Sequence, residues 1–140
     1  QPGQAIFLDA GNLHAYLHGV GVEAMGNSDN VLRGGFTPKH VDADELLRIA
    51  DLRSLADPLV DPTEVSAGEF RYDTPGAPFR FTRWEIDVPR IHTAGGRELL
   101  LCTSGSAGST LGRGTAAYLA AGDCVELTGP ATVFQVAETG

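Results

Sequence analysis

The ten residues "FRFTRWEIDV", at positions 79–88, alternate in polarity along most of their length. The alternation divides them into two sets, the first more apolar than the second: Arg80, Thr82, Trp84, Ile86 and Val88 against Phe81, Arg83, Glu85 and Asp87. Because successive side chains of a strand point to opposite faces, this pattern predicts a β-strand that buries one face.

Further strand-like runs surround this one. They lie at 3–8 ("GQAIFL"), 69–73 ("EFRYD"), 98–104 ("ELLLCTS"), 115–121 ("TAAYLAA"), 124–129 ("CVELTG") and 132–138 ("TVFQVAE"). The stretch 13–25 also alternates well enough to predict one or two more strands. Many short strands with Gly and Pro turns between them are typical of a β-sandwich or barrel. We therefore predict an all-β fold, a β-sandwich or barrel.

One helix is predicted, over residues 42–51 ("DADELLRIAD"), with Asp42 as its N-cap. A connector rich in Pro and Asp follows at 53–64, and the Gly/Ser-rich stretch 104–115 reads as a hairpin or loop. The expected organisation has residues 1–52 as a first part that ends with the helix, and residues 65–140 forming a C-terminal β region. The two together are expected to make one compact domain.

Composition narrows the function classes. The chain has 140 residues, with 42% hydrophobic and 20% charged residues, as in ordinary globular domains. Its net charge of -8 argues against nucleic acid or an anionic membrane as a partner. No run approaches the length of a membrane span. Cys102 and Cys124 lie in apolar runs, which predicts buried thiols in strands and a reducing, cytoplasmic setting.

The stretch 14–40, "HAYLHGVGVEAMGNSDNVLRGGFTPKH", concentrates polar chemistry in a segment that five glycines interrupt. Just before it, residues 3–14 read Gly-x5-Asp-x-Gly-x2-His. This spacing resembles the second motif of the cupins, with Asp9 in place of a proline. In that motif a glycine turn reverses the chain and the histidine enters the barrel as a metal ligand. A buried structural histidine is the alternative reading of His14.

The longer pattern resembles the type I, zinc-dependent mannose-6-phosphate isomerases. The resemblance is dense over residues 3–50, in "GQAIFL", "HAYL", "NSDNVLR", "TPKH" and "ELLRI". It implies a cupin-type jelly roll, a partial bicupin, and the interconversion of mannose 6-phosphate and fructose 6-phosphate through a cis-enediol. Residues 51–140 are compatible with the C-terminal region of that family but carry no motif of their own.

Carried over residue by residue, the resemblance implies a set of roles. His14 would be one of four zinc ligands, and Arg33 the essential cation near the reacting carbons. Tyr16 would line the pocket, and Lys39 would bind the sugar phosphate. Glu23 and Asp29 would be the catalytic carboxylates of this segment.

These residue types suit aldose–ketose isomerisation. The reaction needs a base, a Lewis acid or cation for the developing oxyanion, and a clamp for the phosphate. A carboxylate can supply the base, although the sequence does not decide which one. Arg33 or Lys39 can hold the phosphate, because guanidinium and ammonium groups both bind phosphate oxygens.

The rest of the family's zinc site has no counterpart in the sequence. Its other three ligands, a Gln, a His and a Glu, are expected upstream of residue 1, and His18, His40 and His92 are poor substitutes, with His92 placed in a loop. We therefore expect the C-terminal part of a longer isomerase, inactive alone, whose exposed sheet edges favour self-association. The alternative is a stand-alone small cupin that binds a sugar or sugar phosphate without catalysis.

Overall fold

The computed structural model describes residues 1–28, 30–55 and 57–139. The chain divides into two compact units, one formed by Gln1–Ala5 with Val60–Gly140 and the other by Ile6–Leu59. In the described part of the chain, no helix has the length and apolarity needed to cross a membrane.

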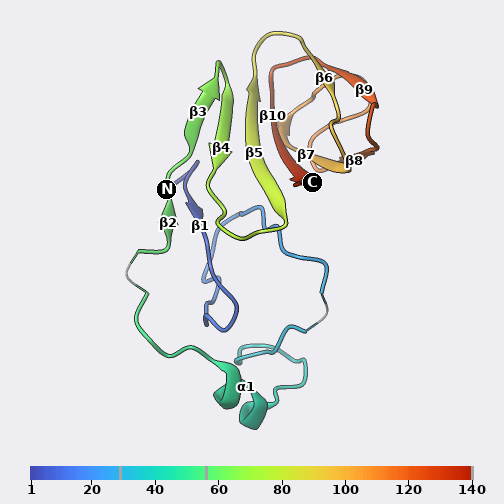
Figure 1. The fold of residues 1–140 in the computed structure, drawn as a ribbon. Helices are drawn as coiled ribbons and strands as arrows, with labels where there is room; N and C mark the ends of the chain where they lie inside the picture. Colours follow the sequence, from blue (N-terminus) through green and yellow to red (C-terminus); the bar gives the residue numbers. More distant parts are fainter. Residues whose placement is uncertain (29, 56, 140) are drawn as a thin grey trace. The chain divides into compact units, whose positions relative to one another are not determined.

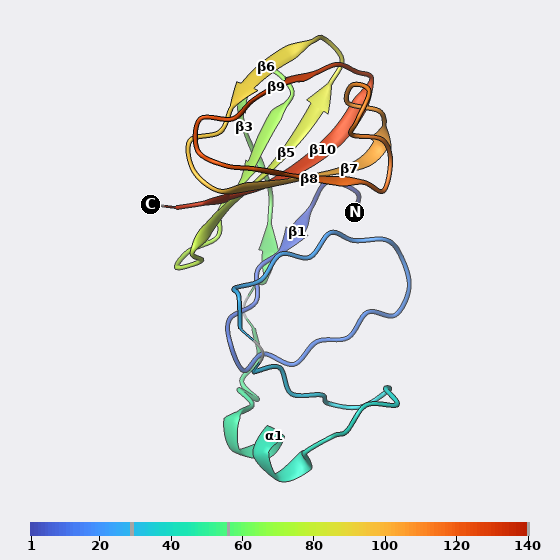
Figure 2. The same cartoon turned by 90° about the vertical axis from the view of Figure 1, so that its right-hand side faces the viewer.

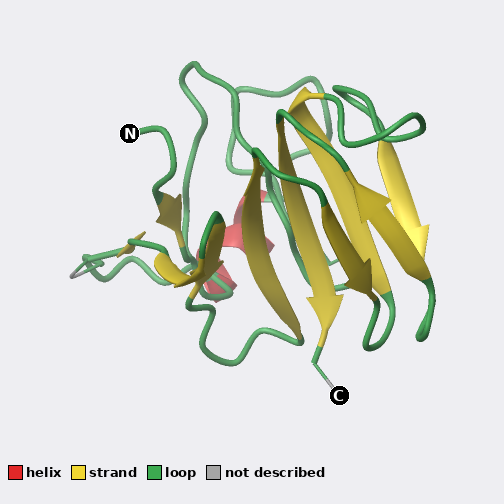
Figure 3. Cartoon of the chain, turned by 90° about the horizontal axis from the view of Figure 1, so that it is seen from above, coloured by secondary structure: helices red, strands yellow, loops and turns green. Residues whose placement is uncertain are grey.

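The larger unit is built on a six-stranded antiparallel sheet (Figures 1 and 3). In spatial order its strands are β3 (Thr63–Ser66), β4 (Glu69–Tyr72), β5 (Phe79–Ile86), β10 (Ala131–Glu138), β7 (Glu98–Gly105) and β8 (Ala116–Leu119). A second, two-stranded antiparallel sheet pairs β6 (Arg90–Thr93) with β9 (Cys124–Leu127). The all-β class with one short helix is therefore confirmed, as a cupin-like β-sandwich.

The core lies between these two sheets. Figure 2 shows β6 and β9 on one side of the six-stranded sheet. Trp84, Leu100 and Val133 of the large sheet form one buried cluster with Leu127 of β9. Each is at most 1% exposed, and burying a side chain of this size contributes about 1.5–3 kcal/mol. We call the side of the large sheet that carries these residues its inner face.

The strand at 79–86 alternates as the sequence predicts. Thr82, Trp84 and Ile86 are buried on the inner face. On the outer face, Phe81 stacks on Phe134 with ring centroids 5.6 Å apart. The hydrophobic alternation therefore sets the orientation of β5 in the sheet.

Gly105 shows why glycine is needed where β7 ends. Its φ is +68°, and a Cβ atom at this position would overlap the carbonyl oxygen of Pro130. The register between β7 and β10 also shifts here, between Thr132 and Val133. A residue without a side chain lets the two backbones approach at this irregularity.

The smaller unit has little regular structure. Its helix α1 (Ala43–Ile49) begins after Asp42, whose side chain accepts a hydrogen bond of 3.0 Å from the backbone N–H of Glu45. The helix is thus confirmed and ends two residues before the predicted boundary. The short strands β1 (Ala5–Ile6) and β2 (Leu59–Val60) pair with each other where the chain passes between the units. None of the described residues between 6 and 59 is buried.

Three expectations from the sequence are wrong. The stretch 13–25 forms no strand, because its glycines interrupt it and its backbone pairs with no strand of the described structure. His92 lies in β6, where it pairs with Val125, and not in a loop. Cys124 is exposed, because the alternation of β9 turns Leu127 inward and Cys124 outward, whereas Cys102 is buried as expected.

Candidate functional site

The chain enters the polar segment 14–40 through a tight turn. The backbone N–H of Asn12 donates to the Asp9 carbonyl at 3.2 Å, and the Asn12 side chain accepts from the Asp9 N–H at 3.0 Å. The Gly11 carbonyl accepts a hydrogen bond of 2.9 Å from the backbone N–H of Asp51, after helix α1. Gly11 itself has a φ of +86°, which favours glycine. The glycine of the motif thus makes the turn that leads to His14.

His14 is exposed and has one ring nitrogen beside the backbone. Its Nδ1 atom lies 3.4 Å from the carbonyl oxygen of Asn12. If Nδ1 carries the proton, the Nε2 lone pair is free, which is the tautomer that metal-binding histidines commonly show. The buried structural histidine that the sequence also allowed is therefore not what the structure shows at this position.

Tyr16 lies beside His14, and Glu23 lies beside Tyr16. The rings of His14 and Tyr16 meet edge to face, with centroids 5.6 Å apart and planes at 81°. Partial burial raises the pKa of the Tyr16 hydroxyl, and the negative charge of Glu23 and its hydrogen bond with Tyr16 raise it further. Of the six residues to which the sequence assigned roles, the structure therefore makes Tyr16 a neighbour of both His14 and Glu23.

Arg33 and Lys39 are exposed, and within the described residues no side-chain hydrogen bond or ion pair joins either to that group. The backbone N–H of Lys39 donates to the Thr37 hydroxyl at 3.2 Å. Between them, Phe36 is fully exposed and has a φ of +53°, which is unusual for a bulky residue. Asp29, the remaining candidate, lies outside the described residues.

A complete zinc site is not formed by the part of the chain that the structure describes. No group of three or more His, Cys, Asp or Glu side chains is placed there so that it could hold a metal ion. Structural and catalytic zinc sites use at least three protein ligands. His14 can offer one nitrogen, so the donor set fits a single ligand and not a whole site.

A second polar cluster, which the sequence did not suggest, lies inside the larger unit. Glu98 of β7 is 2% exposed, and its Oε2 atom lies 2.6 Å from His92 Nε2 and 2.5 Å from Gln135 Nε2. The Gly95 N–H donates to Oε1 at 3.0 Å. The signal in the sequence was a glutamate at an inward position of the apolar run "ELLLC", where a charge requires buried partners.

Comparison with known proteins gives one consistent group. No protein-family model matches the chain. The mannose-6-phosphate isomerase of Escherichia coli (strain K12) is 39% identical over 119 residues, covering 81% of this chain and 29% of that enzyme. The enzyme of the same name from Aspergillus fumigatus is 31% identical over 130 residues, covering 80% of this chain and 28% of that enzyme.

Solved structures agree with the sequence comparison. The apo form of mannose 6-phosphate isomerase from Salmonella typhimurium superposes with a TM-score of 0.65 at 25% identity, covering 83% of this chain and 32% of that chain. A form of the same enzyme bound to its substrate, fructose 6-phosphate, and a zinc atom gives the same values. Three other solved forms of the Salmonella enzyme each carry a single alanine substitution, of a histidine, a glutamate or an arginine. The glutamate lies nine residues after the histidine, and the arginine lies ten residues after the glutamate.

The chain spans less than a third of the length of the relatives that it matches. The likeness nevertheless extends over about four-fifths of the chain, in sequence and in fold alike. The chain is therefore homologous to the mannose-6-phosphate isomerases and fits their C-terminal region.

Proposed function

We propose that this chain contributes the C-terminal part of the active site of a mannose-6-phosphate isomerase, which interconverts mannose 6-phosphate and fructose 6-phosphate. The observation that carries the proposal is a spacing. His14, Glu23 and Arg33 are nine and ten residues apart, as are the histidine, glutamate and arginine replaced in the solved Salmonella enzyme. A shared spacing within homologous segments supports equivalent positions for the three residues.

In this proposal His14 supplies one ligand to a zinc ion through Nε2, with Nδ1 held by the Asn12 carbonyl. The other ligands come from residues outside this chain. When bound, zinc would act as a Lewis acid on an oxygen of the sugar. Because the donor set is incomplete, we propose that the 140-residue chain alone does not catalyse the reaction.

The proton moves between neighbouring carbons of the sugar. A carboxylate, Glu23 or Asp29, removes the proton from C2 of the aldose and returns it to C1, while the hydroxyl proton moves from O2 to O1, which leaves the ketose. Glu23 has Tyr16 as a hydrogen-bond donor, so Tyr16 positions that carboxylate. Arg33 stabilises the oxyanion of the enediolate, and Lys39 binds the phosphate. A cytoplasmic location completes the proposal, and the free thiols of Cys102 and Cys124 are compatible with it.

A chimera tests the proposal. This chain would replace the homologous segment of the Escherichia coli enzyme, and isomerisation and zinc content would be measured together. We expect a zinc-loaded, active enzyme. His14→Ala should lower zinc content and activity, whereas His18→Ala should leave both near the starting values. Arg33→Ala should lower the turnover rate about 100-fold or more, while zinc stays bound.

Some outcomes would contradict the proposal. A folded chimera with zinc content unaffected by His14→Ala would remove His14 from the metal site. Near-normal turnover with Arg33→Ala would remove Arg33 from the reaction. Saturable binding of fructose 6-phosphate without turnover in a folded, zinc-loaded chimera would favour a sugar-binding module instead.

A further inference from the structure

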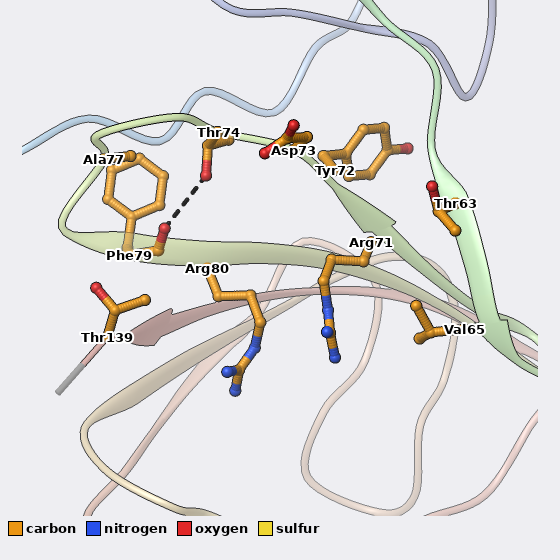
Figure 4. A pocket seen from close by; sticks show the side chains of 10 residues that line it. All are labelled: Thr63, Val65, Arg71, Tyr72, Asp73, Thr74, Ala77, Phe79, Arg80 and Thr139. Carbon is orange, nitrogen blue, oxygen red and sulfur yellow. Dashed lines mark hydrogen bonds between the residues drawn. The ribbon is translucent and has the colours of Figure 1, made fainter.

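A cavity of about 490 Å³ lies on the larger unit, beside strands β3, β4 and β5. Its lining includes Arg71 and Arg80, together with the hydroxyl residues Thr63 and Thr139. Figure 4 shows both guanidinium groups pointing from neighbouring strands to the same side of the sheet. A volume of this size is within the range of small-molecule sites, about 300–1,000 Å³.

The strand register explains why the two arginines share a face. Arg71 of β4 pairs with Thr82 of β5, and Arg80 lies two residues before Thr82 on the same strand. Residues opposite each other in an antiparallel pair, and residues two apart along a strand, point to the same side. Both arginines are therefore on the inner face, with the core residue Trp84.

Arg71 and Arg80 lack the close ion pairs that most of the other arginines make. Five arginines each have a carboxylate oxygen within 3.1 Å: Arg48, Arg53, Arg83, Arg90 and Arg97. Arg71 has only a distant one, Glu69 at 3.9 Å, and that carboxylate also binds Arg90 at 2.9 Å. Arg80 has no ion pair with any described residue. In a chain with a net charge of -8, this is a local surplus of positive charge.

We propose that the cavity binds the phosphoryl group of a small molecule. Two guanidinium groups can each present a pair of N–H donors to phosphate oxygens, and the hydroxyl of Thr63, the residue of β3 opposite Arg71, can add a neutral donor. The one acidic side chain of the lining, Asp73, lies in Figure 4 on the opposite side of the chain from both guanidinium groups. The volume leaves room for an organic body beyond the phosphoryl group.

This site is separate from the one under Proposed function. All of its lining residues belong to the unit that includes Val60–Gly140, whereas His14, Arg33 and Lys39 belong to Ile6–Leu59. It does not depend on zinc or on isomerase activity. Either proposal can fail while the other holds.

The test is a titration of the 15N-labelled 140-residue chain with inorganic phosphate at constant ionic strength, followed by NMR. We expect saturable shifts around residues 71–80, and dissociation constants raised about tenfold or more in Arg80→Gln and in Arg71→Gln. Arg80→Lys should weaken phosphate binding by an intermediate amount, because lysine keeps the positive charge but lacks the paired N–H donors of the guanidinium group. The control is Arg113→Gln, which removes an equal charge from an exposed arginine of the same unit and should not change binding.

Each other result counts against the site. Absence of saturable shifts, or equal weakening in Arg113→Gln, would overturn it. So would shifts that centre on Arg33 and Lys39 and vanish in Arg33→Gln, although those would support the proposed active site. Arg71 is exposed, so Arg71→Gln keeps the test valid if Arg80→Gln fails to fold.

Discussion

The Nε2 atom of His92 lies 2.6 Å from the Oε2 atom of Glu98, in the interior of the β-sandwich. Burial raises the pKa of Glu98, but hydrogen bonds from Gln135, His92 and the Gly95 N–H lower it by more. The net pKa is therefore below the usual value of 4.5. A glutamate that would be costly in an apolar core is thus kept ionised by three donors.

The first prediction concerns acid stability. Because the pKa of Glu98 is lower in the folded state, its carboxylate stabilises the fold above the unfolded-state pKa, and this stabilisation is lost as pH falls below 4.5. Urea unfolding should show that the free energy of unfolding falls between about pH 6 and pH 3, and this fall should be smaller in Glu98→Gln. Glu126→Gln, at an exposed position of β9, should leave the fall unchanged. An identical pH dependence in Glu98→Gln would contradict the role of this carboxylate.

The second prediction concerns Tyr16. Glu23→Gln removes both the negative charge and the carboxylate acceptor that raise the pKa of Tyr16, so that pKa should move down toward the usual 10.0. NMR of the chain with 13C-labelled tyrosine would follow the Tyr16 ring as a signal resolved from those of the other two tyrosines. Tyr118 serves as the internal control, because it lies in β8 and in the other unit. An unchanged Tyr16 titration would mean that the two side chains are not in contact.

The third prediction concerns a buried hydroxyl. Thr82 Oγ1 is fully buried and has no hydrogen-bond partner among the described residues. Thr82→Val should therefore leave the free energy of unfolding unchanged or raise it by up to about 1 kcal/mol. In contrast, Thr132→Val removes a 2.8 Å hydrogen bond to Glu85 and should cost about 0.5–1.5 kcal/mol. A large loss in Thr82→Val would indicate that the hydroxyl binds a buried water.

The fourth prediction concerns Gly105. An alanine there would have an unfavourable φ and would overlap Pro130, so Gly105→Ala should cost about 2 kcal/mol or more. A Cβ atom on Gly112 would meet no atom within 4 Å, and this glycine has no positive φ, so Gly112→Ala is the matched control and should be nearly neutral. Chemical denaturation of both variants would make the comparison. Equal stability of the two would show that the backbones of β7 and β10 can separate at the irregularity.

Much of the β-sandwich was predictable, because the long strands β5, β7 and β10 each bury one face and alternation reports that burial. The strand at 79–86 is the clearest case. The strand position of His92 was not predicted, because turn residues flank its four-residue strand on both sides in "PRIHTAGG". That strand is recognisable only from its pairing with β9. The Arg71 and Arg80 cavity was not predictable, because it depends on a register between two strands.

The candidate site was predictable as a set of residues and not as an arrangement. The motif spacing identified His14, and the resemblance to the isomerases identified Tyr16 and Glu23; in the structure Tyr16 lies beside both of the others. The alternation of apolar and polar residues over 13–25 wrongly suggested strands. The same alternation can occur in a segment that glycines interrupt and whose backbone pairs with no neighbouring strand. Nothing in the sequence reports how Arg33 and Lys39 are oriented, since their positions follow no periodic pattern.

The absence of any buried side chain among the described residues of 6–59 has a consequence for local unfolding. Opening this segment exposes little additional apolar surface, so its opening free energy is far below that of the sandwich. Its backbone amides should exchange with solvent much faster than those of β5 and β10, and limited proteolysis should cut it first. The chain thus has two levels of local stability, with the candidate active-site residues at the lower one and the phosphate-binding cavity at the higher.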